Sequence, residues 1–365
     1  MASIVRVALI EPRAAPVAIL PARTRWRRAW FPTPMLGALS FLVLAALAIF
    51  GWRFLQWAIV YAHWTGSNSE ACVGNDGACW SFVIARWRPW LVGSYPAAEL
   101  WRAWTVFALF IGFCIWIGRR PLTASNTRVL WGFLALPVVL LALLLGGGPL
   151  AFVPPTQWGG VLLTLVATLT TFVTALPLGL LLAIGRRSRL PVVRALSAGF
   201  VEVMRSVPLL AVLFIAATLL PLFLPPGLEF DLFTRALAAF ALFNAAMAAE
   251  VFRGGLQTVG RGQLEAAATV GLSDFAALRL IVLPQAIAAV VPALVNIMIA
   301  VIKETTLLSI VGVNDLLGAI DNGAKSPEWA GEANILTSGQ VFLALVYLTV
   351  CWSLSRYSRR LEARR

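Results

Sequence analysis

Five polar side chains interrupt the long apolar stretches in the C-terminal half of this sequence: Asn244, Asn296, Glu304, Thr305 and Thr306. Polar groups within apolar, membrane-length segments are costly, so we treat them as candidate binding residues. Glu304 could hold a cationic group of a ligand, whereas the amides and hydroxyls could donate or accept hydrogen bonds. Two structural alternatives stay open: each asparagine could bond to a neighbouring helix, and Glu304 could pair with Lys303.

Residues that usually support catalysis or metal binding are sparse. The four cysteines form no CxxC or Cys/His cluster, and His63 is the only histidine, so the sequence offers neither a zinc site nor a His-based triad. No GxxxxGK[ST] stretch occurs, so we expect no ATP-binding site in this chain. The sequence therefore predicts a non-catalytic protein without a metal or cofactor of its own.

The elements that position these side chains must lie in lipid. Hydrophobic residues make up 60% of the chain and charged residues 12%, a composition too apolar for a soluble domain. We expect an all-α polytopic membrane protein with about eight transmembrane helices. The predicted spans are about 35–57, 101–117, 129–145, 161–184, 196–224, 232–252, 285–302 and 335–354. In the fifth, we expect an amphipathic cytoplasmic entry before Pro208, where the span itself begins.

Basic residues predict the orientation of these spans. This topology places 22 of the 29 Lys and Arg residues on one side, which satisfies the positive-inside rule and puts both termini in the cytoplasm. The net charge of +13 is thus a topogenic signal, and we expect no nucleic-acid partner. Cys72 and Cys79, separated by six residues, fall in a loop that then faces an oxidising compartment, where they could form a disulfide bond.

A polar, Gly-punctuated stretch separates two of the apolar runs. It reads EAAATVGLSDFAALRLIVLP and runs from Glu265 to Pro284. Its alanines favour a helix with little side-chain bulk, and Gly271 can adopt the positive φ that ends a helix. Ser273 or Asp274 can cap the next turn, and Pro284 suits the start of the following span. We therefore predict two short helices joined at Gly271.

This stretch resembles the EAA loop of permease subunits of bacterial ATP-binding-cassette (ABC) importers. The resemblance implies a type I importer permease fold with a five-helix core, and coupling to an ATPase through Glu265, Ala266, Ala267, Gly271, Leu283 and Pro284. It also implies several partners: a second permease in a probable heterodimer, an ATPase dimer that binds ATP and Mg, and a periplasmic binding protein. The expected location is the bacterial inner membrane.

Other motifs resemble the polar amino-acid uptake branch of these permeases. VEVMRSVPLL carries Glu202, Arg205 and Pro208, AAEVFRGG carries Glu250 and Arg253, and KETTLLSIVGVNDL resembles a Lys-Asp-Thr-Ser-Leu segment. The N-terminal half, including GACWSFVIARWRPWLVGSYPAAELWR, is similar to the larger subunit of general L-amino-acid importers. On this basis, Glu304 would bind the ammonium of an amino acid, and the asparagines and threonines could serve either of its charged ends.

The expected organisation has three parts. Residues 1–34 form a basic cytoplasmic segment, residues 35–157 carry three accessory spans with a periplasmic loop at about 58–100, and residues 158–365 form the five-helix core with a coupling loop at about 253–284. Two alternatives to a substrate-binding importer subunit are an ion-driven secondary transporter and a scaffold permease. The scaffold would dock the ATPase while its partner carries the substrate site. No detectable inverted repeat supports the secondary transporter.

Overall fold

The computed structural model describes residues 33–74, 76–119, 127–331 and 333–363. It divides into two compact units, one comprising the residues up to Ala62 and the other His63–Arg365. The described residues form helices, turns and three isolated β-bridges, without a β-strand. An all-α membrane protein was predicted, and the described part of the chain has this class.

The first unit contains one membrane-length helix, α2 (Pro34–Leu55), followed by a π-helical turn (Gln56–Val60). The Thr33 side chain caps its start by accepting a hydrogen bond from the Leu36 amide, at 3.3 Å. Pro34 follows in the first turn, where the missing N–H costs nothing. None of the α2 residues is buried. A helix this apolar on every face is suited to a lipid environment.

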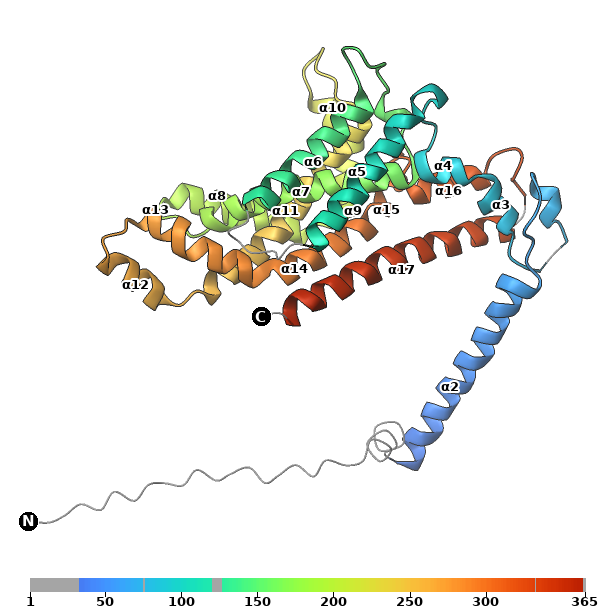
Figure 1. Cartoon of the computed structure of the whole chain (residues 1–365), viewed down its shortest axis with the longest axis horizontal. Helices are drawn as coiled ribbons and strands as arrows, with labels where there is room; N and C mark the ends of the chain where they lie inside the picture. Colours follow the sequence, from blue (N-terminus) through green and yellow to red (C-terminus); the bar gives the residue numbers. More distant parts are fainter. Residues whose placement is uncertain (1–32, 75, 120–126, 332, 364–365) are drawn as a thin grey trace, which may run out of the picture. The chain divides into compact units, whose positions relative to one another are not determined.

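The second unit is a helical bundle whose order along the chain can be followed in Figure 1. Two short helices, α3 (Trp80–Ala85) and α4 (Trp87–Val92), precede the long helices. The remaining helices are α5 (Leu100–Gly118), α6 (Thr127–Leu145), α7 (Gly160–Gly185), α8 (Pro191–Ser206), α9 (Leu209–Phe214), α10 (Leu220–Phe223), α11 (Leu232–Thr258), α12 (Arg261–Thr269), α13 (Asp274–Ala277), α14 (Leu283–Glu304), α15 (Thr306–Ile310), α16 (Leu316–Ala324) and α17 (Ala333–Ala363).

All eight predicted spans coincide with helices. Within the described residues, six single helical segments are long and apolar enough to cross a membrane, and a shorter apolar helix covers Trp131–Leu145. The remaining span is bent: α8 meets the segment Leu209–Phe223 at 104°. Pro208 is the N-cap residue of α9, so the break lies where the sequence predicted the span to begin.

Helix α11 lies at the centre of the bundle and packs most extensively on α7 and then on α14. Gly179 permits the close approach of α7, because a Cβ atom there would lie 2.7 Å from the Ala248 Cβ atom of α11. Such small residues bring membrane helices into contact. Leu162, Leu163 and Phe240 are among the fully buried side chains of the resulting core.

The segment before α5 is part of this bundle. Cys72 and Cys79 form a disulfide bond, with a Cα–Cα distance of 5.8 Å, and the Cys79 amide donates to the Ser338 hydroxyl of α17 at 2.7 Å. The Phe82 ring packs against both Trp90 and Trp329, at centroid distances of 5.1 and 5.2 Å. The disulfide-bonded loop and α3–α4 are thereby fixed against α16 and α17.

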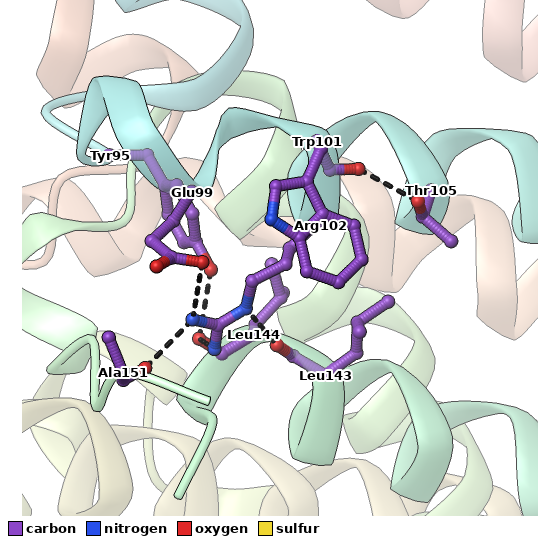
Figure 2. Close-up of polar contacts among 8 residues, drawn as sticks. All are labelled: Tyr95, Glu99, Trp101, Arg102, Thr105, Leu143, Leu144 and Ala151. Atoms are coloured by element: carbon purple, nitrogen blue, oxygen red, sulfur yellow. Dashed lines mark hydrogen bonds and ion pairs between the residues drawn. The ribbon is translucent and has the colours of Figure 1, made fainter. Parts of the chain in front are cut away.

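A buried arginine joins α5 to the end of α6. Arg102 has no solvent exposure, and Figure 2 shows its guanidinium among carbonyl groups of the last turn of α6 and of the loop after it. It donates to the Leu143, Leu144 and Ala151 carbonyls at 2.6, 2.7 and 2.8 Å. These carbonyls lack helical partners, and a cation at a helix C-terminus also complements the helix dipole. Arg102 thus holds two accessory helices and the following turn together.

We predict that Arg102→Met destabilises the purified protein, because it keeps a long side chain but removes every donor. Each buried carbonyl left without a partner should cost about 1–3 kcal/mol. The unfolding midpoint in detergent should fall well below that of Arg119→Met, which alters an exposed arginine at the other end of α5. Equal midpoints for the two variants would contradict the capping role.

Candidate functional site

Three of the five predicted binding residues meet at the C-terminal end of α14. Glu304 is the last residue of α14, and it forms a side-chain hydrogen bond with Asn244 of α11. Asn244 is 2% exposed, and its amide nitrogen also donates to the Phe240 carbonyl at 3.0 Å. Thr305 follows directly and is fully buried. Two helices therefore bring a carboxylate, an amide and a hydroxyl into one small region.

Part of the Glu304 carboxylate remains available. Its buried Oε2 atom has no hydrogen-bond partner among the described residues. Among the described residues, Lys303 forms no direct ion pair with Glu304, although its charge acts on the Glu304 carboxylate. A buried, unpartnered carboxylate oxygen is unusual and can accept a donor from a ligand.

The other two predicted residues lie differently. Thr306 donates its hydroxyl to the Lys303 carbonyl at 2.7 Å, so it bonds to its own chain at the break between α14 and α15. Asn296 is exposed and lies eight residues before Glu304, about 12 Å along the helix axis. The structure thus brings Asn244, Glu304 and Thr305 together and leaves Asn296 on an open face of α14.

Tyr347 and Thr164, which were not predicted from the sequence, extend the group that Thr305 forms with Asn244 and Glu304. The Tyr347 hydroxyl of α17 lies 3.3 Å from the Thr305 hydroxyl, and it also forms a hydrogen bond with Thr164 of α7. The Thr164 hydroxyl in turn accepts from the Leu316 amide of α16 at 3.2 Å. We call Thr164, Asn244, Glu304, Thr305 and Tyr347 the polar cluster. Thr164 and Tyr347 could have been found because each places a costly hydroxyl within an apolar span. The same reasoning selected Asn244.

A second carboxyl group lies beside the polar cluster. Asp315 is fully buried and caps α16, where its Oδ1 accepts from the Gly318 amide at 2.9 Å, but its Oδ2 atom has no partner among the described residues. Burial raises the pKa of Asp315 to about 7, and the charge of Asp321 adds to this effect, whereas the amides of Gly318 and Leu317 oppose it. Asp315 thus retains its proton at pH values well above the usual pKa of an aspartate.

The predicted EAA stretch forms a separate element between α11 and α14. Helix α12 ends before Gly271, which has φ = +79°, and the Ser273 hydroxyl then caps α13 by accepting from the Ala276 amide at 3.3 Å. A π-helical turn (Leu278–Val282) leads into α14, where Pro284 occupies the first turn. Two short helices joined at Gly271 were predicted, and the structure contains them. We call residues 261–282 the coupling element.

The coupling element exposes apolar side chains beyond the ends of the long helices. Val270, Phe275 and Leu280 are 74%, 71% and 62% exposed, and Glu265 and Ala266 are also exposed. Ala267 and Ala277 are buried and hold the two short helices to the rest of the element. Leu283 and Pro284 belong to α14 and are partly buried. Apolar side chains exposed together on a polar segment are typical of a protein interface.

Comparison with known families agrees with this arrangement. The family described as the binding-protein-dependent transport system inner membrane component matches residues 175–365, more than half of the chain. The chain belongs to this family. The matched region contains most of the helical core, the coupling element and every residue of the polar cluster except Thr164. The resemblance to ABC importer permeases is thereby confirmed, and the chain is a multi-pass inner membrane permease.

Individual relatives extend this similarity beyond the family match. The inner membrane amino-acid ABC transporter permease protein YhdY of Escherichia coli (strain K12) is 39% identical over 320 residues, covering 85% of this chain and 84% of that protein. A second relative is the glutamate/glutamine/aspartate/asparagine transport system permease protein BztC of Rhodobacter capsulatus. It is 33% identical, and the match covers 99% of this chain and 97% of that protein. These permeases therefore also match the accessory N-terminal half.

A solved structure supports the fold of the core. The crystal structure of an amino acid ABC transporter with histidines has a chain that is 29% identical to this one, with a TM-score of 0.51. The match covers 56% of this permease and 92% of the other chain. The shared part is thus nearly the whole of a shorter permease, to which this chain adds its accessory helices.

The buried Asp315 predicts a pH dependence of stability. Its pKa is about 7 in the folded protein, against an ordinary value of 3.8, so its favourable contribution is complete below about pH 4 and is lost as the pH rises to about 7. Asp315→Asn keeps a capping oxygen but does not ionise. Between pH 4 and 8, the unfolding midpoint of the wild type should fall relative to that of Asp315→Asn. Parallel pH profiles would contradict a buried, titrating Asp315.

Proposed function

We propose that this permease is a transmembrane subunit of an ATP-driven amino-acid importer. In this proposal it forms half of the translocation pathway, pairs with a second permease and works by alternating access. The coupling element carries the proposal: it has the full EAA register, it is exposed, and it presents Val270, Phe275 and Leu280 to a partner. An ATPase dimer that binds ATP and Mg would seat this element, and a periplasmic binding protein would deliver the substrate.

The orientation follows from the same assignment. The coupling element must face the ATPase in the cytoplasm, and the 22 of 29 basic residues assigned to that side support both termini being cytoplasmic. The polar cluster lies at the opposite end of α14 from the coupling element, because Leu283 begins this helix and Glu304 ends it. The cluster would then face the periplasmic half of the pathway.

An amino acid is the substrate class that fits the polar cluster best. Its ammonium group would donate to the unpartnered Oε2 atom of Glu304, and Asn244 would hold the Glu304 carboxylate in place. The Thr305 and Tyr347 hydroxyls could accept from the ammonium or donate to the carboxylate. Relatives named as amino-acid permeases, among them YhdY and BztC, support this substrate class.

A scaffold role is the second candidate. Tyr347 already bonds to Thr305 and to Thr164, so part of the polar cluster is satisfied without a ligand. In that case the partner permease would carry the substrate site, while this chain would dock the ATPase. Variants of Glu304 distinguish the two functions.

The reconstituted complex tests the importer function. The chain would be purified with its co-expressed neighbours, and amino-acid uptake and ATP hydrolysis would be measured in liposomes. We expect a co-purified ATPase and a second permease, with ATP-dependent uptake stimulated by a soluble binding protein. Uptake driven by an ion gradient without ATP would instead support a secondary transporter and contradict the proposal.

We predict that Gly271→Val abolishes ATP-driven uptake. A Cβ atom at this position meets nothing within 4 Å, so the effect arises from the positive φ, which a β-branched residue adopts poorly. Binding of the periplasmic protein should persist. Gly271→Asn is the matched control, since Asn tolerates this conformation, and it should retain most uptake. Normal uptake by Gly271→Val would remove the proposed coupling role.

We predict that Glu304→Gln weakens the apparent affinity for amino acids while the complex still assembles. The loss of a charged hydrogen bond is worth about 1.5–3 kcal/mol, or roughly ten- to a hundredfold in the concentration for half-maximal uptake. Glu229→Gln, at an exposed outer position, serves as the control and should behave as the wild type. An unchanged half-maximal concentration for Glu304→Gln would favour the scaffold role.

A further inference from the structure

A dense group of charges lies at the end of the bundle next to the coupling element. Glu250 of α11 forms ion pairs with three arginines. Arg253 lies at 2.8 Å and Arg205 of α8 at 3.2 Å, and Arg186, the residue directly after α7, also pairs closely with the Glu250 carboxylate. The Glu250 and Arg186 side chains are only 18% and 17% exposed. One carboxylate thus joins three helices in a largely buried setting.

Arg186 also reaches a second carboxylate. Its Nη2 atom lies 3.8 Å from Glu202 of α8, while its Nη1 atom bonds to Glu250 of α11. Each of these glutamates has an arginine three residues later, Arg205 and Arg253, so two Glu-x-x-Arg pairs on different helices face each other across Arg186. A guanidinium can bond in two directions at once, which an ammonium cannot do equally well.

Two further arginines in the turn after α7, Arg187 and Arg189, contact other parts of the chain. Arg187 donates to the Leu256 carbonyl near the end of α11 at 3.1 Å. Arg189 pairs with Asp274 of the coupling element at 2.9 Å, and these two side chains are 92% and 85% exposed. Residues 186–189 therefore contact the ends of α8 and α11 on one side and the coupling element on the other.

We propose that residues 186–189 form a linkage that keeps the coupling element in register with the cytoplasmic ends of α7, α8 and α11, with Arg186 as its main positioning residue. The inference rests on the proposed importer function and adds to it the route by which motion at the ATPase reaches the helices. Arg186 touches neither substrate nor nucleotide in this scheme, and it acts by holding Glu202 and Glu250 in a fixed relation.

Differences in exposure divide the linkage into a fixed and a breakable part. Glu250 and Arg186 are largely buried, whereas Arg253, Arg205 and Glu202 are 36%, 45% and 71% exposed. Removing Arg186 would take a partner from a largely buried carboxylate, which is costly. The exposed Arg189–Asp274 pair contributes little to stability and is screened by salt. A contact of that kind can form and break as the coupling element moves, while the Glu250 group keeps α7, α8 and α11 as one body.

Four single variants in the reconstituted complex test this proposal: Arg186→Gln, Arg186→Lys, Arg189→Gln and Arg194→Gln. The readout is the number of ATP molecules hydrolysed per amino acid transported, together with the amount of ATPase that co-purifies. Arg194 is an exposed arginine of α8 in the same basic segment, and no ion pair to it is formed among the described residues, so Arg194→Gln is the matched control. Arg186→Lys keeps the charge but cannot bridge two carboxylates as well.

We expect both Arg186 variants to raise the ATP cost per transported amino acid at least several-fold, with Arg186→Gln the more severe and with normal ATPase co-purification. Arg189→Gln should raise it about twofold at low salt, and raising the salt from about 0.05 to about 0.5 M should bring the wild type to the same value. Arg194→Gln should match the wild type under both conditions.

Two results would overturn the linkage. The first is a ratio of ATP to amino acid that is the same in both Arg186 variants as in Arg194→Gln. The second is a fall in co-purified ATPase or in protein yield with an unchanged ratio, which would make Arg186 a structural residue only. A wild-type complex without ATP-dependent uptake would refute the importer function itself and the linkage with it, so the two failures are distinguishable.

Discussion

Polar groups in a bundle surrounded by lipid must find their partners within the protein, because no water is present to replace them. This constraint explains the most distinctive contacts of the permease. Arg102 satisfies carbonyls in the last turn of α6 and in the loop after it, and the Tyr347 hydroxyl of α17 bonds to Thr305 and Thr164. Each contact joins helices that are distant in sequence, so the cost of an unpaired group also fixes the packing of the helices.

The same constraint applies to buried polar atoms that have no partner. Glu304 and Asp315 each keep one buried carboxylate oxygen without a partner among the described residues. Burial raises the pKa of Asp315 to about 7, so below about pH 7 a proton on this carboxyl removes the cost of a buried charge. Glu304 lies at the end of α14, where a ligand's donor could satisfy it. One constraint thus accounts for a structural carboxyl group and for a candidate binding carboxylate.

Helix α14 connects the coupling element to the polar cluster. It begins at Leu283, directly after the coupling element, and ends at Glu304 in the polar cluster, a length of about 33 Å. Pro292 lies inside this helix and removes one of its backbone hydrogen bonds, but the helix is continuous from end to end. A displacement of the coupling element could therefore pass along it to the polar cluster. The Glu250 group links the neighbouring helices α7, α8 and α11. In this account, α14 would move relative to these three helices, which would stay together.

Local features of the fold could be predicted from the sequence, whereas contacts between helices could not. Gly271, Ser273, Pro284 and Pro208 act through their own backbone and near neighbours, and the structure has the turns and caps predicted for them. Glu202 and Glu250 were seen as motif residues, but the sequence does not reveal that Arg186 joins them. Three of the five residues of the polar cluster were predicted, because the cost of polar residues selects Asn244, Glu304 and Thr305. It does not say that Tyr347 bonds to Thr305.

Contact between the coupling element and the ATPase is the most direct test of this account. A photocrosslinking amino acid would replace Val270, which is 74% exposed in the coupling element, and Leu222, which is 77% exposed near the outer end of the bent span, would be replaced as a control. Irradiation of the active complex should attach the ATPase at position 270 and not at position 222. An active complex without a crosslink at position 270, or with equal crosslinks at both positions, would contradict the proposed docking surface.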